Sequence, residues 1–267
     1  MNLFHTLQRQ FATAARAVIE FSFPPTCPLC NGEATSDECV FPSFCDSCRD
    51  ELIQPVQFAC DVCGAPVGQF VDSSKGCGEC KRNDMIYKRV VRLGVYSEAL
   101  RKAVIKAKDR LQEPLMAACG RLLVEECADE LTEPRPDLLI PIPQHWSNRF
   151  VSQHNTAEVL ANVIGRMLGL PVSHDTLARA SRTAPQKRCP SVEARKANQR
   201  GSFALNASDE LAGKNVLLVD DVFTTGSTAN EASRTLRRAG AKIIGIAVIA
   251  RVLSTKPVTN AAGPSSG

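Results

Sequence analysis

Four pairs of cysteines constrain this chain more than any other feature of its sequence. Nine of the twelve cysteines lie within residues 27–80, and eight of them form CxxC pairs: Cys27/Cys30, Cys45/Cys48, Cys60/Cys63 and Cys77/Cys80. Fourteen residues separate the first two pairs, and thirteen separate the last two. Two residues between cysteines let a tight turn aim both thiolates at one point, and a tetrahedral zinc ion takes four such ligands. The spacing therefore predicts two structural zinc ions.

The pairing of these cysteines is open to two arrangements. In the simpler, consecutive one, Cys27, Cys30, Cys45 and Cys48 hold one ion, and Cys60, Cys63, Cys77 and Cys80 hold the other. In an interleaved arrangement the pairs alternate between the ions, and the spacing does not exclude it. A redox role fits less well, because that role is typical of a single CxxC beside a βαβ unit. With four protein ligands, neither ion keeps an open position for catalysis. Metal binding would instead supply folding energy to a segment with a small core.

From residue 90 onward, short apolar runs alternate with helical patterns. The runs "VVRLGVY", "DLLIPIP", "VLLV" (216–219) and "KIIGIAVIA" predict strands. Helical spacing follows Ser97 and continues over residues 115–131, 155–168 and 227–239. Strands that alternate with helices predict a parallel sheet with helices on both faces. Residues 179–201 show no period and predict a long loop, which carries seven basic residues against one acidic residue over 179–200.

The stretch "VLLVDDVFTTGST", residues 216–228, places two carboxylates and a small polar loop after a buried strand. Ligands bind beyond the carboxyl ends of parallel strands, and the N–H groups that open a helix favour phosphate. Gly226 lets the backbone approach the anion. Asp220 and Asp221 suit sugar hydroxyls or a hydrated Mg²⁺. The Walker GK[ST] pattern is absent. The stretch therefore predicts a site for a phosphorylated sugar, with the phosphate in the loop Thr224, Thr225, Gly226, Ser227 and Thr228.

The same stretch resembles the phosphoribosyl diphosphate (PRPP) motif of type I phosphoribosyltransferases. With the cysteine pairs, the chain resembles the ComF family (competence protein F) over residues 21–251. "YSEALRKAVIKAKDR" resembles the family's tyrosine-to-lysine helix, with Lys108 as the matching lysine, and "IPIPQH" resembles the loop that faces pyrophosphate. "TAPQKRCPSVEARKANQRGSF" matches a further family segment. The family's GFNQAE stretch is matched only through Asn155, Ala157 and Glu158, with Thr156 in place of Gln.

The resemblance implies an α/β chain with the type I phosphoribosyltransferase fold, a parallel sheet flanked by helices, preceded by a cysteine-rich zinc-binding segment. We expect an N-terminal amphipathic helix at 1–26, a double zinc-binding domain at 27–89, a phosphoribosyltransferase domain at 90–251 and a disordered tail at 252–267. The net charge of +4 is too small to decide the partner. A homo-oligomer is compatible with the sequence but is not supported by it.

The resemblance also implies an enzyme, a phosphoribosyltransferase that moves the phosphoribosyl group of PRPP to or from an unidentified nitrogenous acceptor. The leaving group would be pyrophosphate with Mg²⁺. Asp220 and Asp221, the catalytic candidates, would take the ribose hydroxyls, and residues 224–228 would take the 5′-phosphate. The pyrophosphate would lie near Gln144 and His145, beneath a lid formed by residues 182–200. Further candidate PRPP ligands are Lys108, which is equally compatible with a plain surface lysine, and the lid residues Gln186 and Arg195.

The alternative is a non-catalytic protein of the competence machinery that senses PRPP and binds single-stranded DNA or other competence proteins. Acidic residues outnumber basic ones over residues 1–90, so a DNA footprint would lie on the 179–200 side. No apolar stretch has the length of a membrane span, and charged residues interrupt the apolar run that an N-terminal signal peptide needs. We therefore expect a cytoplasmic protein without disulfides.

Overall fold

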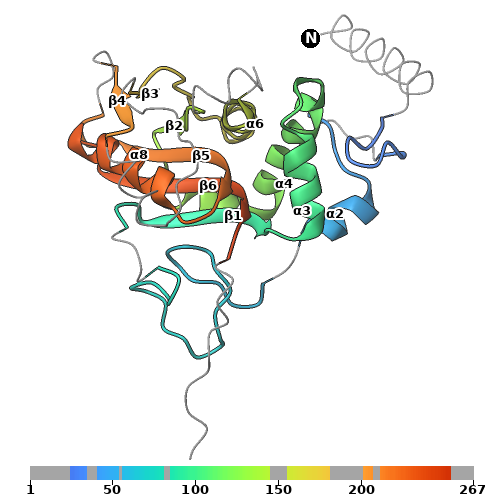
Figure 1. Ribbon diagram of the computed structural model, residues 1–267, viewed down its shortest axis with the longest axis horizontal. Helices are drawn as coiled ribbons and strands as arrows, with labels where there is room; N and C mark the ends of the chain where they lie inside the picture. The colour runs from blue at the N-terminus through green and yellow to red at the C-terminus, as the bar shows by residue number, and fades with distance from the viewer. Residues whose placement is uncertain are drawn as a thin grey trace, which may run out of the picture.

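A four-stranded parallel sheet lies at the centre of the computed structural model (Figure 1). The strand order is β1 (Arg89–Val95), β6 (Ile243–Arg251), β5 (Asn215–Phe223) and β2 (Leu138–Pro141). The structure describes residues 25–34, 41–53, 56–80, 85–144, 155–180, 201–206 and 211–253. Nearly all of the expected N-terminal helix and most of the expected tail lie outside these residues. The division of the chain into four regions stays a prediction.

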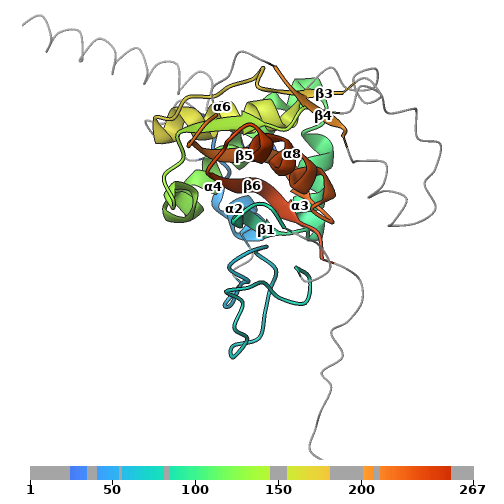
Figure 2. The same ribbon diagram turned by 90° about the vertical axis from the view of Figure 1, so that its left-hand side faces the viewer.

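Helices cover both faces of the sheet, as the sequence predicts. The elements α3 (Glu98–Lys106), α4 (Glu113–Thr132) and α6 (Thr156–Leu168) lie on one face, and α8 (Ser227–Arg238) lies on the other (Figures 1 and 2). A short 3₁₀ turn, η1 (Arg110–Gln112), leads into α4. Because side chains alternate along a strand, Leu217 and Val219 of β5 join the core of α4 and α6. Val216 and Leu218 join the core beneath α8.

Strand β5 is longer than the sequence analysis predicts. The prediction ends the strand at Val219, but β5 continues through both aspartates to Phe223. The reason is its neighbour β6, which continues alongside and pairs with β5 as far as Phe223↔Arg251. Strand β2, on the other side, already ends at Pro141 opposite Val219. The two aspartates therefore lie in a strand that projects beyond the end of β2.

A two-stranded antiparallel ribbon was not predicted from the sequence. It consists of β3 (Leu177–Arg179) and β4 (Phe203–Leu205), and it brackets the predicted long loop. Three-residue strands are too short for a period to show in the sequence. Leu177 and Phe203 are buried against the α8 face of the sheet. Residues 181–200, which contain the whole proposed lid, lie outside the described residues.

The helix start expected after Ser97 is confirmed, and α6 has a capping residue at each of its ends. The Ser97 side chain accepts a hydrogen bond from the Leu100 N–H group at the start of α3. The Asn155 side chain caps α6 in the same way, through the Ala157 N–H group. Gly169 ends α6 in the left-handed conformation. None of the helices in the described part of the chain has the length and apolar character needed to cross a membrane.

The cysteine-rich segment contacts the sheet domain at two separate places. Its first part includes α2 (Asp46–Leu52) and lies beside α3 and α4, whereas its second part forms loops below β1 (Figure 1). Figure 2 shows the second part in the same position beneath β1, at the edge of the sheet. The two predicted zinc sites are therefore set against different parts of the fold.

Candidate functional site

The eight cysteines form two groups of four, in the consecutive pairing. Cluster 1 consists of Cys27, Cys30, Cys45 and Cys48, and cluster 2 consists of Cys60, Cys63, Cys77 and Cys80. The sulfur atoms of each group all lie within 4.8 Å of one another. Contacts across the pairs measure 3.7 Å for Cys30–Cys45, 3.7 Å for Cys63–Cys77 and 3.5 Å for Cys60–Cys80. Four thiolates about 2.3 Å from one tetrahedral zinc ion lie roughly 3.8 Å apart, so both clusters fit a structural zinc ion.

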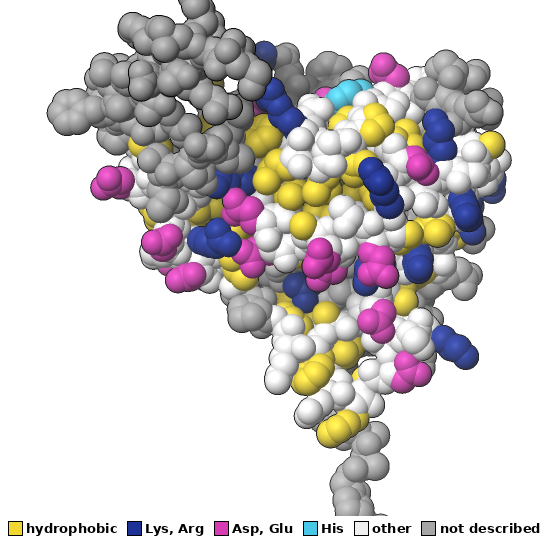
Figure 3. All heavy atoms as spheres, turned by 180° about the vertical axis from the view of Figure 1, so that it is seen from behind, with side chains coloured by type: hydrophobic (Ala, Val, Ile, Leu, Met, Phe, Trp, Pro, Cys, Tyr) yellow, Lys and Arg dark blue, Asp and Glu magenta, His cyan; other side chains and the backbone are white. Residues whose placement is uncertain are grey.

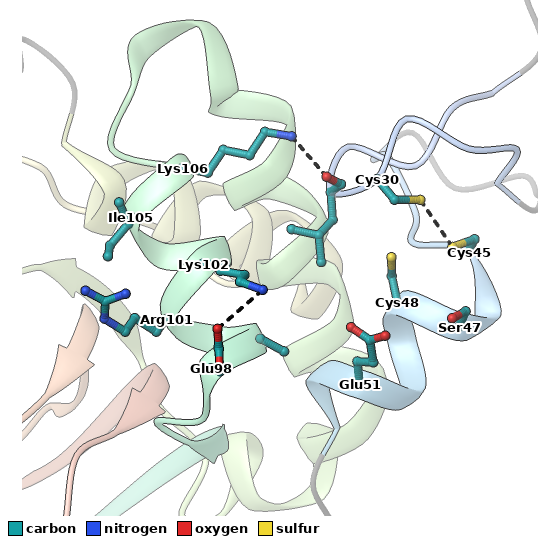
Figure 4. Close-up of a pocket in the computed structure, with 12 residues that line it drawn as sticks. Cys30, Cys45, Ser47, Cys48, Glu51, Glu98, Arg101, Lys102, Ile105 and Lys106 are labelled. Atoms are coloured by element: carbon teal, nitrogen blue, oxygen red, sulfur yellow. Dashed lines mark hydrogen bonds and ion pairs between the residues drawn. The ribbon is translucent and has the colours of Figure 1, made fainter.

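The two clusters differ in their exposure. All four cysteines of cluster 2 are buried. In cluster 1, Cys27 and Cys48 are buried, but Cys30 is exposed. Cluster 1 adjoins a cavity of about 900 Å³ between α2 and α3, and Figure 4 shows Cys30, Cys45 and Cys48 on one side of it and Lys102 of α3 on the other. Cluster 1 therefore opens toward solvent, and cluster 2 is enclosed.

The loop between β5 and α8 has the geometry of an anion site. Gly226 adopts a left-handed conformation (φ 73°) and precedes Ser227, the first residue of α8. A Cβ atom at Gly226 would lie 2.6 Å from the Phe223 ring, so only glycine fits. The N-cap residue Gly226 has no side chain to cap the helix, the Ser227 N–H group makes a long contact of 3.4 Å with the Thr225 hydroxyl, and no acidic residue occupies the first turn. The hydroxyls of Thr225 and Ser227 lie 2.9 Å apart at the same end. The N–H groups of the first turn and these hydroxyls can therefore bind a phosphate.

Asp221 points toward the face of the sheet that α6 covers. Its Oδ2 atom accepts a hydrogen bond from the Thr156 hydroxyl at 3.1 Å, at the start of α6. The ammonium group of Lys108, just after α3, lies 3.9 Å from the same oxygen. Three elements that are separate in the sequence thus meet at Asp221. The Lys108 side chain is about half exposed, so its charge is also available to a ligand.

Asp220 points toward the opposite face, where β3 lies. Its pKa is raised well above the usual range, first because the carboxylate is poorly hydrated and second because Asp221 carries a like charge nearby. The Arg179 guanidinium opposes this rise. Arg179 donates through Nε to the Pro143 carbonyl at 2.9 Å and stacks over the Phe203 ring at 4.4 Å. Burial lowers the pKa of Arg179, and Asp220 counteracts that shift.

The structure brings together the candidates of the β5–α8 loop, both aspartates and Lys108. Gln144 is half-buried and follows Pro143, the residue that Arg179 contacts. His145, Gln186 and Arg195 lie outside the described residues. Thr156 and Arg179 were not predicted as site residues from the sequence. Their only signals were a departure from the family pattern for Thr156 and membership of a basic run for Arg179, and neither signal shows which group the side chain contacts.

Comparisons with known proteins agree with both parts of this geometry. Residues 18–81 match the family model of the double zinc ribbon domain, and residues 117–261 match that of the phosphoribosyl transferase domain. The chain is 31% identical to DNA utilization protein YhgH of Salmonella typhi over 217 residues, which cover 79% of this chain and 91% of that protein. It is 28% identical to competence protein F of Haemophilus influenzae over 212 residues, which cover 78% and 90% of the two chains.

These matches span most of both relatives. The two family models include the cysteine clusters and the β5–α8 loop. The double zinc ribbon accounts for the two groups of four thiolates, and the phosphoribosyltransferase fold accounts for the parallel sheet with helices on both faces. The chain belongs to the ComF family, whose members include competence protein F and DNA utilization protein YhgH.

Proposed function

We propose that this protein binds PRPP at the carboxyl end of β5 and transfers its phosphoribosyl group to or from a nitrogenous acceptor. One observation carries the proposal: a helix with glycine as its N-cap and no acidic residue in its first turn begins at the left-handed Gly226, directly after a strand that presents two adjacent carboxylates. Phosphate needs N–H donors, and ribose hydroxyls need acceptors. The loop and the aspartates offer both within a few residues of each other.

Each part of PRPP has candidate partners in the site. The N–H groups and hydroxyls of residues 224–228 would hold the 5′-phosphate. Asp221, fixed by Thr156 and Lys108, would accept a hydrogen bond from a ribose hydroxyl, and Asp220 would accept another from its side of the strand. The pyrophosphate would lie near Gln144 and Arg179, where a guanidinium is already fixed against the loop after β2.

In the proposed reaction the protein forms and breaks no covalent bonds of its own. The bond from ribose C1 to the pyrophosphate oxygen breaks, and its electron pair leaves with pyrophosphate. A bond from C1 to the acceptor nitrogen forms, and that nitrogen loses a proton. The protein aligns the reactants and stabilises the charge of the leaving group. Mg²⁺ would enter with PRPP and neutralise part of that charge. Arg179 would add a fixed positive charge on the same side.

Calorimetric titration of the zinc-loaded protein with Mg-PRPP tests the proposal. We expect the wild type to bind and Asp220→Asn/Asp221→Asn to lose at least tenfold in affinity. The matched control is Asp129→Asn/Glu130→Gln, which removes two adjacent charges from an exposed part of α4 and should bind like the wild type. Absence of wild-type binding would overturn the proposal. If PRPP binds, pyrophosphate release in the presence of nucleobases tests the transfer step.

The names of the relatives favour a second candidate function. Competence protein F and a DNA utilization protein match most of this chain, which supports a PRPP-responsive role in handling single-stranded DNA. On the face drawn in Figure 3, acidic and basic side chains of the described residues are interspersed, which does not suit a DNA clamp. A DNA affinity that falls steeply with salt and disappears on neutralising Arg195, Lys196 and Arg200 would support this candidate.

A further inference from the structure

Arg251 lies between cluster 2 and the proposed PRPP loop, which is residues 224–228 between β5 and the start of α8. It is the last residue of β6 and pairs in register with Phe223, the last residue of β5. Its side chain is 3% exposed. Nη1 donates a hydrogen bond of 2.6 Å to the Thr224 carbonyl, and the guanidinium stacks over the Phe223 ring at 4.8 Å. Arg251 thus holds the first residue of the loop by its backbone.

The other side of the guanidinium faces the zinc ligands. Nη2 of Arg251 lies 3.7 Å from a carboxylate oxygen of Glu79. Glu79 lies between Cys77 and Cys80, in the turn that supplies two of the four thiolates of cluster 2. Because both flanking ligands are fixed when the ion is bound, the metal also fixes the backbone that carries Glu79. One buried cation therefore connects the cluster 2 turn to the loop backbone.

A second set of contacts runs parallel to this one. The Tyr87 ring meets the Phe223 ring edge-on, with centroids 5.9 Å apart. A Cβ atom at Gly226 would lie 3.2 Å from the Tyr87 hydroxyl, so Tyr87 lies directly under the loop. The Ile86 N–H group donates to Asn230 in the first turn of α8 at 2.9 Å. Met85, the residue before Ile86, packs against the small core that the cysteines of cluster 2 form with Ala65.

We propose that Glu79 and Arg251 are positioning residues that couple zinc binding at cluster 2 to phosphate binding at the PRPP loop. The inference rests on the proposed function, since it concerns the affinity of that site for PRPP. A buried guanidinium that loses its carboxylate is left with an unpaired charge. The hydrogen bond from Arg251 to the Thr224 carbonyl then changes as well. Coupling of two binding equilibria is reciprocal, so PRPP must strengthen zinc binding at cluster 2 by the factor by which zinc strengthens PRPP binding.

Cluster 1 provides the internal control. It packs on α3 and α4 and opens toward the cavity of Figure 4. Glu51 of α2 borders that cavity beside cluster 1, as Glu79 lies beside cluster 2. The proposal therefore predicts that only one of the two zinc ions responds to PRPP. It also predicts that Glu51→Gln leaves that response unchanged.

The experiment is an equilibrium competition for zinc between the full-length protein and a chelator of known affinity, with and without saturating Mg-PRPP. In the wild type, PRPP should raise the zinc affinity of one site by about fivefold or more, in the range usual for coupled sites. A Cys30→Ser variant, which leaves cluster 2 as the only complete site, identifies that site. Glu79→Gln should retain two zinc ions, lose the response and bind PRPP correspondingly more weakly.

Two outcomes overturn the inference. One is wild-type protein that binds PRPP by calorimetry while both zinc affinities stay unchanged, and the other is Glu79→Gln that keeps the full response. Failure of the proposed function looks different, because the wild type then binds no PRPP at all. In that case hydrogen exchange decides the coupling: faster exchange of the amides at 224–227 in Glu79→Gln supports it, and unchanged exchange overturns it.

Discussion

Clusters 1 and 2 both consist of four cysteines, but they differ in how they pack against the rest of the protein. Cys27 and Cys48 of cluster 1 are part of the main hydrophobic core, together with Leu52 of α2 and residues of α3 and α4. Cluster 2 forms a small core of its own, in which Ala65 is, among the described residues, the only buried hydrophobic residue besides the four cysteines. The first cluster extends a core that already exists. The second replaces a core that its segment cannot build from apolar side chains.

Their attachments to the sheet domain differ in the same way. Beside cluster 1, Arg121 of α4 donates to the Phe41 carbonyl at 3.0 Å, and Lys106 of α3 donates to the Pro28 and Leu29 carbonyls at 3.0 Å each. These bonds supplement extensive apolar packing. The segment of cluster 2 is held through backbone and charged contacts, including the Val90 N–H group on the Val62 carbonyl at 2.8 Å. The segment of cluster 2 is thus attached less extensively to the sheet domain than that of cluster 1, but it lies closer to the PRPP loop.

The largest expected effect separates the clusters directly. Cys63→Ser should reduce bound zinc from two ions per chain to one and make residues 56–80 accessible to protease, because their core consists of the ligands. Binding of structural zinc is worth about 10–16 kcal/mol in small zinc domains, so this loss exceeds what the segment can replace. Cys30→Ser should also cost one ion, but residues 41–53 should stay protected by their packing. Metal analysis and limited proteolysis compare the variants, and equal protection of both segments would refute the difference.

The second prediction concerns the packing that holds cluster 1. Leu52 is fully buried in the main core. Leu52→Ala should lower the free energy of unfolding by about 2–5 kcal/mol, because it leaves a cavity. Denaturant titration measures this loss, and the zinc affinity of cluster 2 should be unchanged. The control is Leu111→Ala, at a residue that is 82% exposed, with an expected change below about 0.5 kcal/mol. A result for Leu52→Ala as small as that of the control would show that cluster 1 is independent of the core.

The third prediction tests the packing of Tyr87 and Phe223 between cluster 2 and the PRPP loop. Gly226→Ala should destabilise the protein by about 1–3 kcal/mol and lower PRPP affinity more than tenfold, because the new Cβ meets the Phe223 ring in a left-handed backbone. Gly213→Ala is the matched control, since Gly213 is also left-handed (φ 75°) but has no atom within 4 Å of the added Cβ. It should show backbone strain alone and normal PRPP affinity in calorimetry. Similar losses of stability and of PRPP affinity in the two variants would argue against close packing of Phe223 and Tyr87 beneath the loop.

The fourth prediction concerns Asp220. Its raised pKa means that the folded chain holds a proton that the unfolded chain releases near pH 3.9. The contribution of this group to stability is therefore complete below that pH and is lost as the pH rises through the folded pKa. Asp220→Asn should be about 1–2 kcal/mol more stable than the wild type at neutral pH, and the gap should close in acid. Denaturant titrations of both proteins measure it, and a gap that widens in acid would contradict the raised pKa.

The smallest effect is expected where cluster 1 meets α3. Lys106→Met removes both hydrogen bonds to the Pro28 and Leu29 carbonyls but keeps most of the apolar stem. We expect a loss of about 1 kcal/mol or less and a change in PRPP affinity below about threefold. Calorimetry and denaturant titration provide both values. A loss of PRPP affinity in Lys106→Met as large as that in Glu79→Gln would mean that both clusters are coupled to the loop. The proposed difference between clusters 1 and 2 would then be wrong.

Some parts of the site were predictable because their signals are local. The CxxC turns, the cap residues Ser97 and Asn155, and the loop around Gly226 each act through neighbours within a few residues, so the sequence displays them. The extent of β5 was underestimated, because pairing with β6 rather than local pattern carries the strand to Phe223. The β3–β4 ribbon was missed, since short strands are defined by their partners.

The sequence by itself determined the four CxxC turns, the glycine loop that opens α8 and the alternation of strands and helices, because spacing and residue type express these directly. Only the tertiary structure decided which cysteines share an ion, that Thr156 and Lys108 meet at Asp221, and that Arg251 connects Glu79 to Thr224. These contacts join residues that are far apart in the chain. They depend on how the sheet brings its strand ends together, and no local pattern records that arrangement.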